Sequence, residues 1–146
     1  MLTTEERLEI EKEFKMYPYK QAACIEALKV IQKHRRWVSD DSLKDISEIL
    51  EMPVEEIDGV ATFYNLIYRK PVGRHVILLC DSASCYIMGY ETVLEYLEKK
   101  LGIKYGQTTH DDKFTLLPVV CLGTCDHAPA MMVGRDLHQN LTPGKI

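Results

Sequence analysis

Several features that would place this sequence in a common class are missing from it. No Cys-x-x-Cys pair is present, although a thioredoxin-type disulfide enzyme needs one. No Gly-x-Gly-x-x-Gly follows a strand-like run, so the dinucleotide-binding fingerprint is absent as well. The longest apolar runs are far shorter than the roughly 20 residues of a membrane helix, which argues against membrane insertion. Low-complexity segments and internal repeats are also absent, so we expect an ordinary folded chain.

Basic charge is scarce too. The formal net charge is −4, and the lysines and arginines are interleaved with acidic residues. This pattern argues against nucleic acid or an anionic membrane as a partner. The amino-terminal residues lack the basic-then-apolar layout of a secretory signal. We therefore expect a cytoplasmic protein, in which cysteines stay reduced and serve as metal ligands or reactive groups.

Residues 1–70 have the pattern of a small bundle of short amphipathic helices. Thr3 and Glu6 form a capping-box pattern, which predicts a first helix from about Thr4 to Met16. A second helix is indicated by apolar residues at helical spacing, namely Cys24, Ala27, Leu28 and Ile31. Because it shares this stripe, Cys24 is interpreted as a small core residue.

Two more helices complete the predicted bundle. Start signals and an apolar face define the third: Ser39, Asp40 and Asp41, then Leu43, Ile46 and Leu50. Pro53 fits the first turn of a short fourth helix, which we expect to end at Gly59. In the aromatic stretch that follows, Phe63 and Tyr64 are interpreted as core residues at the junction between two domains.

Residues 71–146 show a different pattern, with strands and helices in alternation. The run HVILL, from His75, predicts a strand buried on both faces. A helix should follow with an apolar face and end at Gly102: Tyr90, Val93, Leu94, Leu97 and Leu101. FTLLPVV and AMMV predict two more strands, with Pro118 restricting where the first lies in a sheet.

Four of the five cysteines form two pairs in this second half. Cys80 ends the predicted strand and Cys85 lies just before a helix, while Cys121 and Cys125 flank a loop that contains Gly123. Three kinds of site compete for these sulfurs. A structural zinc usually has tighter knuckles, and a disulfide enzyme lacks its motif. A [2Fe-2S] cluster needs two thiolates on each iron, and the C-x4-C spacing is one that plant-type ferredoxins use, so the spacing favours it.

The histidines fit this site less well. His127 follows Cys125 closely, as in half of a Rieske site, but no later cysteine supplies the other half. We interpret His127 as a solvated loop residue, and the remaining histidines lie in no shared motif.

The letters around the cysteines resemble a known family. DDKFTLLPVVCLGTCDHAP, CDSASC and GVATFYNLIYRKPVG are similar to the signature of the [2Fe-2S] E subunit of NADH:quinone oxidoreductases, the respiratory complex I family. Asp111, Phe114 and Thr115 match that signature in order, and Cys-Leu-Gly-x-Cys ends two residues before Ala-Pro. The similarity extends through RRWV to the LTP near the end, so it covers almost the whole chain.

The resemblance implies a fold class of mixed α+β or α/β type, with a helical bundle at 1–70 and a thioredoxin-like [2Fe-2S] ferredoxin domain at 71–146. Carried over by position, Cys80 and Cys85 would bind one iron of a single cluster, and Cys121 and Cys125 the other. The chain would transfer electrons beside the FMN of the NADH-binding F subunit and other peripheral-arm subunits, on the cytoplasmic face of the inner membrane. It would be one subunit of an oxidoreductase, without a complete active site of its own.

Two rival functions and two local departures accompany this interpretation. NAD-linked hydrogenases and formate dehydrogenases use similar subunits, and a zinc-stabilised interaction module is a rival of another class. Arg36 and Asp112 stand where relatives often have glycine, which predicts locally different turns. Asp81 and Asp126 each follow a cysteine directly, and we expect their charges to lower the potential of a cluster.

Overall fold

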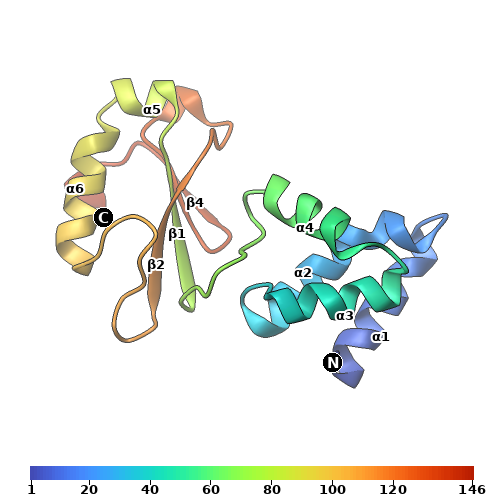
Figure 1. Cartoon of the computed structure of the whole chain (residues 1–146). Coiled ribbons are helices and arrows are strands. Elements are labelled where there is room, and N and C mark those ends of the chain that lie inside the picture. The colour runs from blue at the N-terminus through green and yellow to red at the C-terminus, as the bar shows by residue number, and fades with distance from the viewer. The chain divides into compact units, whose positions relative to one another are not determined.

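The computed structural model describes residues 1–146, and the chain divides into two compact units, Met1–Pro71 and Val72–Ile146 (Figure 1). We call them the helical unit and the sheet unit. The helical unit consists of α1 (Thr4–Glu13), η1 (Phe14–Met16), η2 (Lys20–Ala23), α2 (Cys24–Arg35), α3 (Asp40–Leu50) and α4 (Val54–Phe63), where η denotes a 3-10 helix.

The predicted start of the first helix is confirmed. The Thr3 hydroxyl accepts a hydrogen bond from the Glu6 N–H at 3.2 Å, and the Glu6 carboxylate accepts one from the Thr3 N–H at 2.8 Å. This is a complete capping box, which satisfies two donors that a helix start leaves unpaired. The expected end at Met16 is wrong by one turn, because Phe14–Met16 tighten into a 3-10 helix.

The helical unit is closed by an apolar core and by one buried ion pair. The predicted stripes of the second and third helices all point into that core: Cys24, Ala27, Leu28 and Ile31, with Leu43, Ile46 and Leu50. Glu6 is 1% exposed, and its carboxylate accepts hydrogen bonds from Arg35 Nε at 2.7 Å and Nη2 at 2.6 Å. The pair ties α1 to α2, and Arg35 also donates to the Ser42 hydroxyl on α3 at 3.1 Å.

Two expectations for the end of the helical unit are wrong. The fourth helix continues through Gly59 to Phe63, because Ile57 and Ala61 keep an apolar face in the core on both sides of the glycine. A glycine weakens a helix by about 1 kcal/mol but does not by itself end one. Phe63 and Tyr64 are not core residues: they are 79% and 45% exposed, and their rings meet edge to face at 5.1 Å.

The sheet unit is a four-stranded mixed sheet with helices. Its elements are β1 (His75–Cys80), α5 (Ala83–Ile87), α6 (Tyr90–Leu101), β2 (Phe114–Val119), η3 (Cys125–His127), β3 (Met131–Val133), β4 (Asp136–His138) and η4 (Pro143–Lys145). The strand order is β2-β1-β3-β4. β1 pairs with β2 in parallel and with β3 antiparallel, and β4 continues antiparallel beside β3.

The sheet confirms three predicted strands and adds a fourth. Every residue of β1 after His75 is buried, as the run HVILL indicates. β2 is an edge strand, and its Pro118 is exposed, so the missing N–H interrupts no central ladder. β4 was not predicted, because it is three residues long and exposed throughout.

Helix α6 covers one face of the sheet. Val93 and Leu97 of this helix are buried in a cluster with Ile77 and Leu79 of β1 and Leu116 of β2. The helix ends at Gly102, which takes the left-handed conformation (φ 68°) as predicted. A strand, a helix and a parallel strand therefore form the unit's framework, which places the ends of β1 and β2 at the same edge (Figure 1).

The turns at Arg36 and Asp112 keep the backbone conformation that favours glycine. Their φ angles are 71° and 56°, both in the left-handed region. The expectation of locally different turns is therefore wrong, because the surrounding hydrogen bonds hold the backbone in place. Arg36 N–H donates to the Gln32 carbonyl at 2.7 Å, and Asp112 N–H donates to that of Thr109 at 2.9 Å.

No helix in either unit combines the length and apolar character needed to cross a membrane.

Candidate metal centre

The first cysteine pair is built into the regular structure of the sheet unit. Cys80 is the last residue of β1, and its N–H donates to the Ala130 carbonyl at 3.1 Å. Cys85 lies inside the short helix α5, not just before a helix as expected from sequence. The side chains are 1% and 2% exposed. Burial, together with the neighbouring Cys80 thiol, raises the pKa of Cys85 to about 11.

The second cysteine pair lies in an exposed loop. Cys121 follows β2, and Cys125 begins the 3-10 helix η3. Their Sγ atoms are 3.2 Å apart, and the Gly123 N–H donates to Cys121 Sγ at 3.3 Å. Gly123 has φ 76°, a conformation that other residues seldom adopt. The hydrogen bond between the two thiols lowers the pKa of Cys121 and raises the pKa of Cys125.

Buried polar contacts fix the base of this second loop. The Thr124 side chain is 8% exposed, and its hydroxyl accepts a hydrogen bond from Gln139. The Thr124 carbonyl accepts one from the His127 N–H at 3.0 Å. The loop is therefore held in one shape although its two sulfurs are open to solvent.

The parallel pairing of β1 and β2 brings the two loops together. Cys80 is opposite Val119 in the register, so Cys121 begins only two residues beyond that pair. Ser84 of the first loop affects the pKa of Cys125, and Cys125 contributes to the raised pKa of Cys85, so the two loops are neighbours. Sequence reasoning placed both pairs in loops after strands, and the structure shows the loops at one edge of the sheet.

The donor set is chemically uniform. No group of three or more His, Cys, Asp or Glu side chains is arranged to hold a single metal ion. A binuclear iron-sulfur cluster needs fewer protein ligands at each metal, because two thiolates bind each iron. One close pair of thiols on each of two adjacent loops fits that requirement.

The other candidate side chains take no part in this arrangement. His127 is 51% exposed and lies 3.3 Å from the carboxylate of Asp126, as expected for a solvated loop residue. Cys24 lies in the core of the helical unit at 5% exposure, and burial raises its pKa to about 11. The interpretation of Cys24 as a core residue is confirmed.

Four exposed apolar residues are adjacent in sequence to Cys85 or Cys121. We call them the apolar rim, which consists of Tyr86 (56% exposed), Ile87 (78%), Met88 (61%) and Val120 (66%). Sequence reasoning missed it. The signal was the run Tyr-Ile-Met directly after Cys85, which a helix of five residues is too short to bury.

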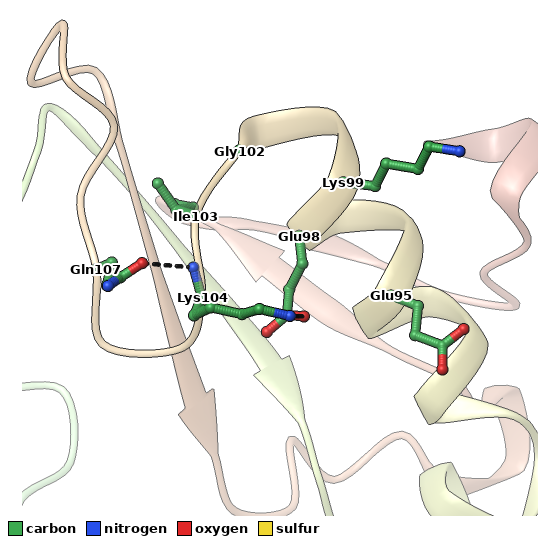
Figure 2. Close-up of a pocket in the computed structure, with 7 residues that line it drawn as sticks. All are labelled: Glu95, Glu98, Lys99, Gly102, Ile103, Lys104 and Gln107. Atoms are coloured by element: carbon green, nitrogen blue, oxygen red, sulfur yellow. Dashed lines mark hydrogen bonds and ion pairs between the residues drawn. The ribbon is translucent and has the colours of Figure 1, made fainter.

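A separate pocket of the sheet unit lies at the carboxyl end of α6, away from the cysteines in sequence (Figure 2). Three of its polar residues interact with one another. Lys104 forms an ion pair with Glu98, and its N–H donates to the Gln107 side chain at 2.8 Å. Glu95 and Lys99 also line the pocket, which contains none of the five cysteines.

Comparisons with known proteins agree on one family. The model of the family described as thioredoxin-like [2Fe-2S] ferredoxin matches residues 10–146. The NADH-quinone oxidoreductase E subunit of Pseudomonas aeruginosa is 52% identical over 146 residues, which cover 100% of this chain and 88% of that protein. The Escherichia coli protein of the same name is 52% identical over 145 residues, or 99% of this chain and 87% of that protein.

Solved structures show the same fold. An NAD+-reducing [NiFe]-hydrogenase in the H2-reduced state superposes with a TM-score of 0.71 at 24% identity, over 84% of this chain and 20% of that one. At this identity the likeness establishes the fold alone.

Proposed function

Because this chain belongs to the thioredoxin-like [2Fe-2S] ferredoxin family, we propose that it is an electron-transfer subunit of an NADH-quinone oxidoreductase. The observation that carries this function is the 52% identity over the full chain, together with four thiols gathered on two loops at one sheet edge. The protein carries one [2Fe-2S] cluster and works as one part of an oxidoreductase complex. We also propose that the two compact units are the two domains expected from sequence.

The proposed ligands are the four cysteines of the sheet unit. Cys80 and Cys85 hold one iron, and Cys121 and Cys125 hold the other. The support is the sulfur contact of 3.2 Å in the second pair and the parallel register of β1 and β2, which places both pairs at one end of the sheet. The cysteines of the two pairs also affect one another's pKa values. Thiolate is the ligand type that such clusters require.

The chain's own residues position and shield this site. A bound [2Fe-2S] cluster supplies one-electron transfer, chemistry that no amino-acid side chain of this chain provides. β1 and α5 bury the first thiol pair, which excludes water from one side of the site. The Gly123 N–H donates to Cys121 Sγ, and such hydrogen bonds to ligand sulfurs are one way in which proteins tune cluster potentials.

The proposed partner is the FMN-containing, NADH-binding F subunit, among the other peripheral-arm subunits. The apolar rim supports this, because exposed apolar groups next to a redox site suit a protein contact rather than open solvent. A contact there would also bring a flavin close to the proposed cluster. We place the assembled complex on the cytoplasmic face of the inner membrane.

One experiment tests electron transfer directly. The chain, reduced with dithionite and then freed of it, is mixed anaerobically with the oxidised flavin-containing partner of its complex. We expect the flavin absorbance to bleach while the electron paramagnetic resonance (EPR) signal of the chain decays. If the two proteins bind but the flavin stays oxidised, the proposed function is wrong.

A second experiment tests the partner surface. Ile87→Asp and Val120→Asp place charges on the apolar rim, and both should weaken co-purification with the flavin-containing partner. Leu8→Asp is the matched control, because Leu8 is 61% exposed but belongs to the helical unit. Iron content is measured in every variant. Unchanged binding by both rim variants would remove the rim from the interface.

A further inference from the structure

We propose that, in the cluster-free chain, Cys121 and Cys125 form a reversible disulfide on exposure to a peroxide, while Cys80 and Cys85 remain thiols. The second cysteine loop is thereby a redox-sensitive gate for cluster assembly. The disulfide itself depends only on the chain, whereas its effect on assembly rests on the proposed ligand set.

The geometry of the second pair favours bond formation. The two Sγ atoms are 3.2 Å apart, and a disulfide bond needs about 2.0 Å. Three residues separate the cysteines, and the left-handed Gly123 makes the tight turn between them. The buried Thr124 and its bond from Gln139 hold the base of the loop, so the two sulfurs stay neighbours.

The two cysteine pairs differ in their exposure to solvent. Cys121 and Cys125 are exposed, whereas Cys80 and Cys85 are 1% and 2% exposed. The two thiols of the first pair also lie near one another, since Cys80 contributes to the raised pKa of Cys85. A dissolved oxidant must reach a sulfur first, and burial protects thiols from that encounter. Cys24, at 5% exposure and in the other unit, is protected in the same way.

The chemistry balances with a peroxide as the oxidant. The thiolate of one exposed cysteine attacks a peroxide oxygen, which gives a sulfenic acid and releases hydroxide. The thiol of the other cysteine then attacks that sulfur, the S–S bond forms, and water leaves. Hydrogen peroxide is reduced by two electrons, and the cysteine pair is oxidised by two. A dithiol reductant reverses the reaction through a mixed disulfide.

The consequence for the site follows from the ligand set. A disulfide between Cys121 and Cys125 removes both proposed ligands of one iron. Cluster assembly then requires a prior two-electron reduction of this loop. Oxidation of Cys80 and Cys85 would have the same effect, but their burial makes the second loop the sensitive one.

Peptide mapping of the oxidised chain tests the disulfide. The cluster-free full chain is treated with hydrogen peroxide, and the remaining free thiols are alkylated. Trypsin leaves Cys121 and Cys125 together in peptide 114–135, and Cys80 and Cys85 together in peptide 75–99. We expect peptide 114–135 to lose two hydrogen masses and escape alkylation, at a rate about tenfold above any change in peptide 75–99.

Two variants make the result decisive. Cys85→Ser should leave oxidation of peptide 114–135 unchanged, whereas Cys125→Ser should abolish its intrapeptide disulfide. A disulfide confined to peptide 75–99, or no disulfide in either peptide, would falsify the inference.

A second arm measures assembly. The oxidised chain is supplied with iron and sulfide anaerobically, before and after treatment with a dithiol. We expect uptake only after reduction, seen as iron content and visible absorbance. Equal uptake before reduction, with the disulfide mapped in place, would overturn the gate and the proposed ligand set together. A failed disulfide alone would leave the ligand set standing.

Discussion

The two units of this chain use their polar side chains in opposite ways. In the helical unit the charged groups clamp helices to one another: Glu6 is buried against Arg35, and Arg69 pairs with Asp40 at 2.6 Å and Asp58 at 2.8 Å. In the sheet unit the framework is apolar, and the reactive thiols gather at one edge of it. The first unit pairs charges between its helices, whereas the second gathers the thiols that we propose as ligands.

This difference explains how five cysteines of one chain take different roles. Cys24 lies on a core stripe of the helical unit, whereas the other four cysteines all belong to the sheet unit. The other four lie at or just beyond the carboxyl ends of the parallel strands β1 and β2, where we propose that they bind the cluster. The five thiols therefore differ in role because they differ in their place in the fold.

The largest expected effect comes from breaking the buried pair of the helical unit. Glu6→Gln leaves the Arg35 guanidinium without its carboxylate, and we expect a loss of about 2–3 kcal/mol in the free energy of unfolding. Urea unfolding followed by circular dichroism measures it. Cluster absorbance in the folded variant should match the wild type, since the pair lies outside the sheet unit.

The same pair makes the helical unit sensitive to acid. Hydrogen bonding from Arg35 lowers the pKa of Glu6 from 4.5 to about 2. Because the folded-state pKa is the lower one, the stabilisation is complete above pH 4.5 and is lost as the pH falls towards 2. The stability gap between the wild type and Glu6→Gln should shrink across that window. A gap independent of pH would contradict the assigned role of the pair.

One glycine in each unit allows a comparison of local packing, with a smaller expected effect on stability. A Cβ on Gly73 would lie 3.0 Å from the Lys113 carbonyl carbon, so Gly73→Ala should destabilise the sheet unit by about 1–2 kcal/mol. Gly59 in α4 has no atom within 4 Å of such a Cβ, so Gly59→Ala should stabilise the helical unit by about 0.5–1 kcal/mol. Thermal unfolding of both variants tests the opposite signs.

The left-handed turns provide a still smaller test, again with one residue in each unit. Arg36→Gly and Asp112→Gly should each be more stable by about 0.5 kcal/mol than the alanine variant at the same position, because glycine relieves the strain of a positive φ. Arg36→Ala and Asp112→Ala, which keep the strain, are the matched controls. A gain in the alanine variants equal to that in the glycine variants would show that the backbone conformation is not the cause.

The smallest effect concerns charge near the cysteines. Asp81→Asn and Asp126→Asn each remove a negative charge that disfavours reduction, so the cluster midpoint potential should rise on the order of tens of millivolts. Both aspartates are exposed, so screening by solvent should keep each effect small. Redox titration monitored by EPR measures both. Unchanged midpoints would leave peptide N–H groups and solvent as the controlling factors.

Sequence patterns predicted those parts of the fold that depend on local periodicity. The stripe of Cys24, Ala27, Leu28 and Ile31 is buried as predicted, and the strand ending at Cys80 is buried from Val76 onward. The capping box of Thr3 and the stop at Gly102 are local hydrogen-bonding motifs, and both are found. Such features are visible in sequence because their causes lie within a few residues.

Features that depend on tertiary packing were beyond the sequence. Phe63 and Tyr64 look like core aromatics, but the core of the helical unit forms without them and both are exposed. Val119 is the last residue of β2 and is buried, whereas Val120 lies beyond the strand and is exposed. The two cysteine pairs differ in burial in the same way, because one lies in β1 and α5 and the other in a loop. β4 carries no periodic signal at all, because none of its residues is buried.

The ligand set is the central claim, and iron and acid-labile sulfide analysis of a cysteine series tests it most directly. Cys80→Ser, Cys85→Ser, Cys121→Ser and Cys125→Ser are purified anaerobically beside the wild type and Cys24→Ala, and each is examined by EPR after dithionite reduction. We predict two irons, two sulfides and a rhombic signal in the wild type and Cys24→Ala, and a lost or altered cluster in each of the other four. A full, unaltered cluster in any of those four, or its loss in folded Cys24→Ala, would contradict the account.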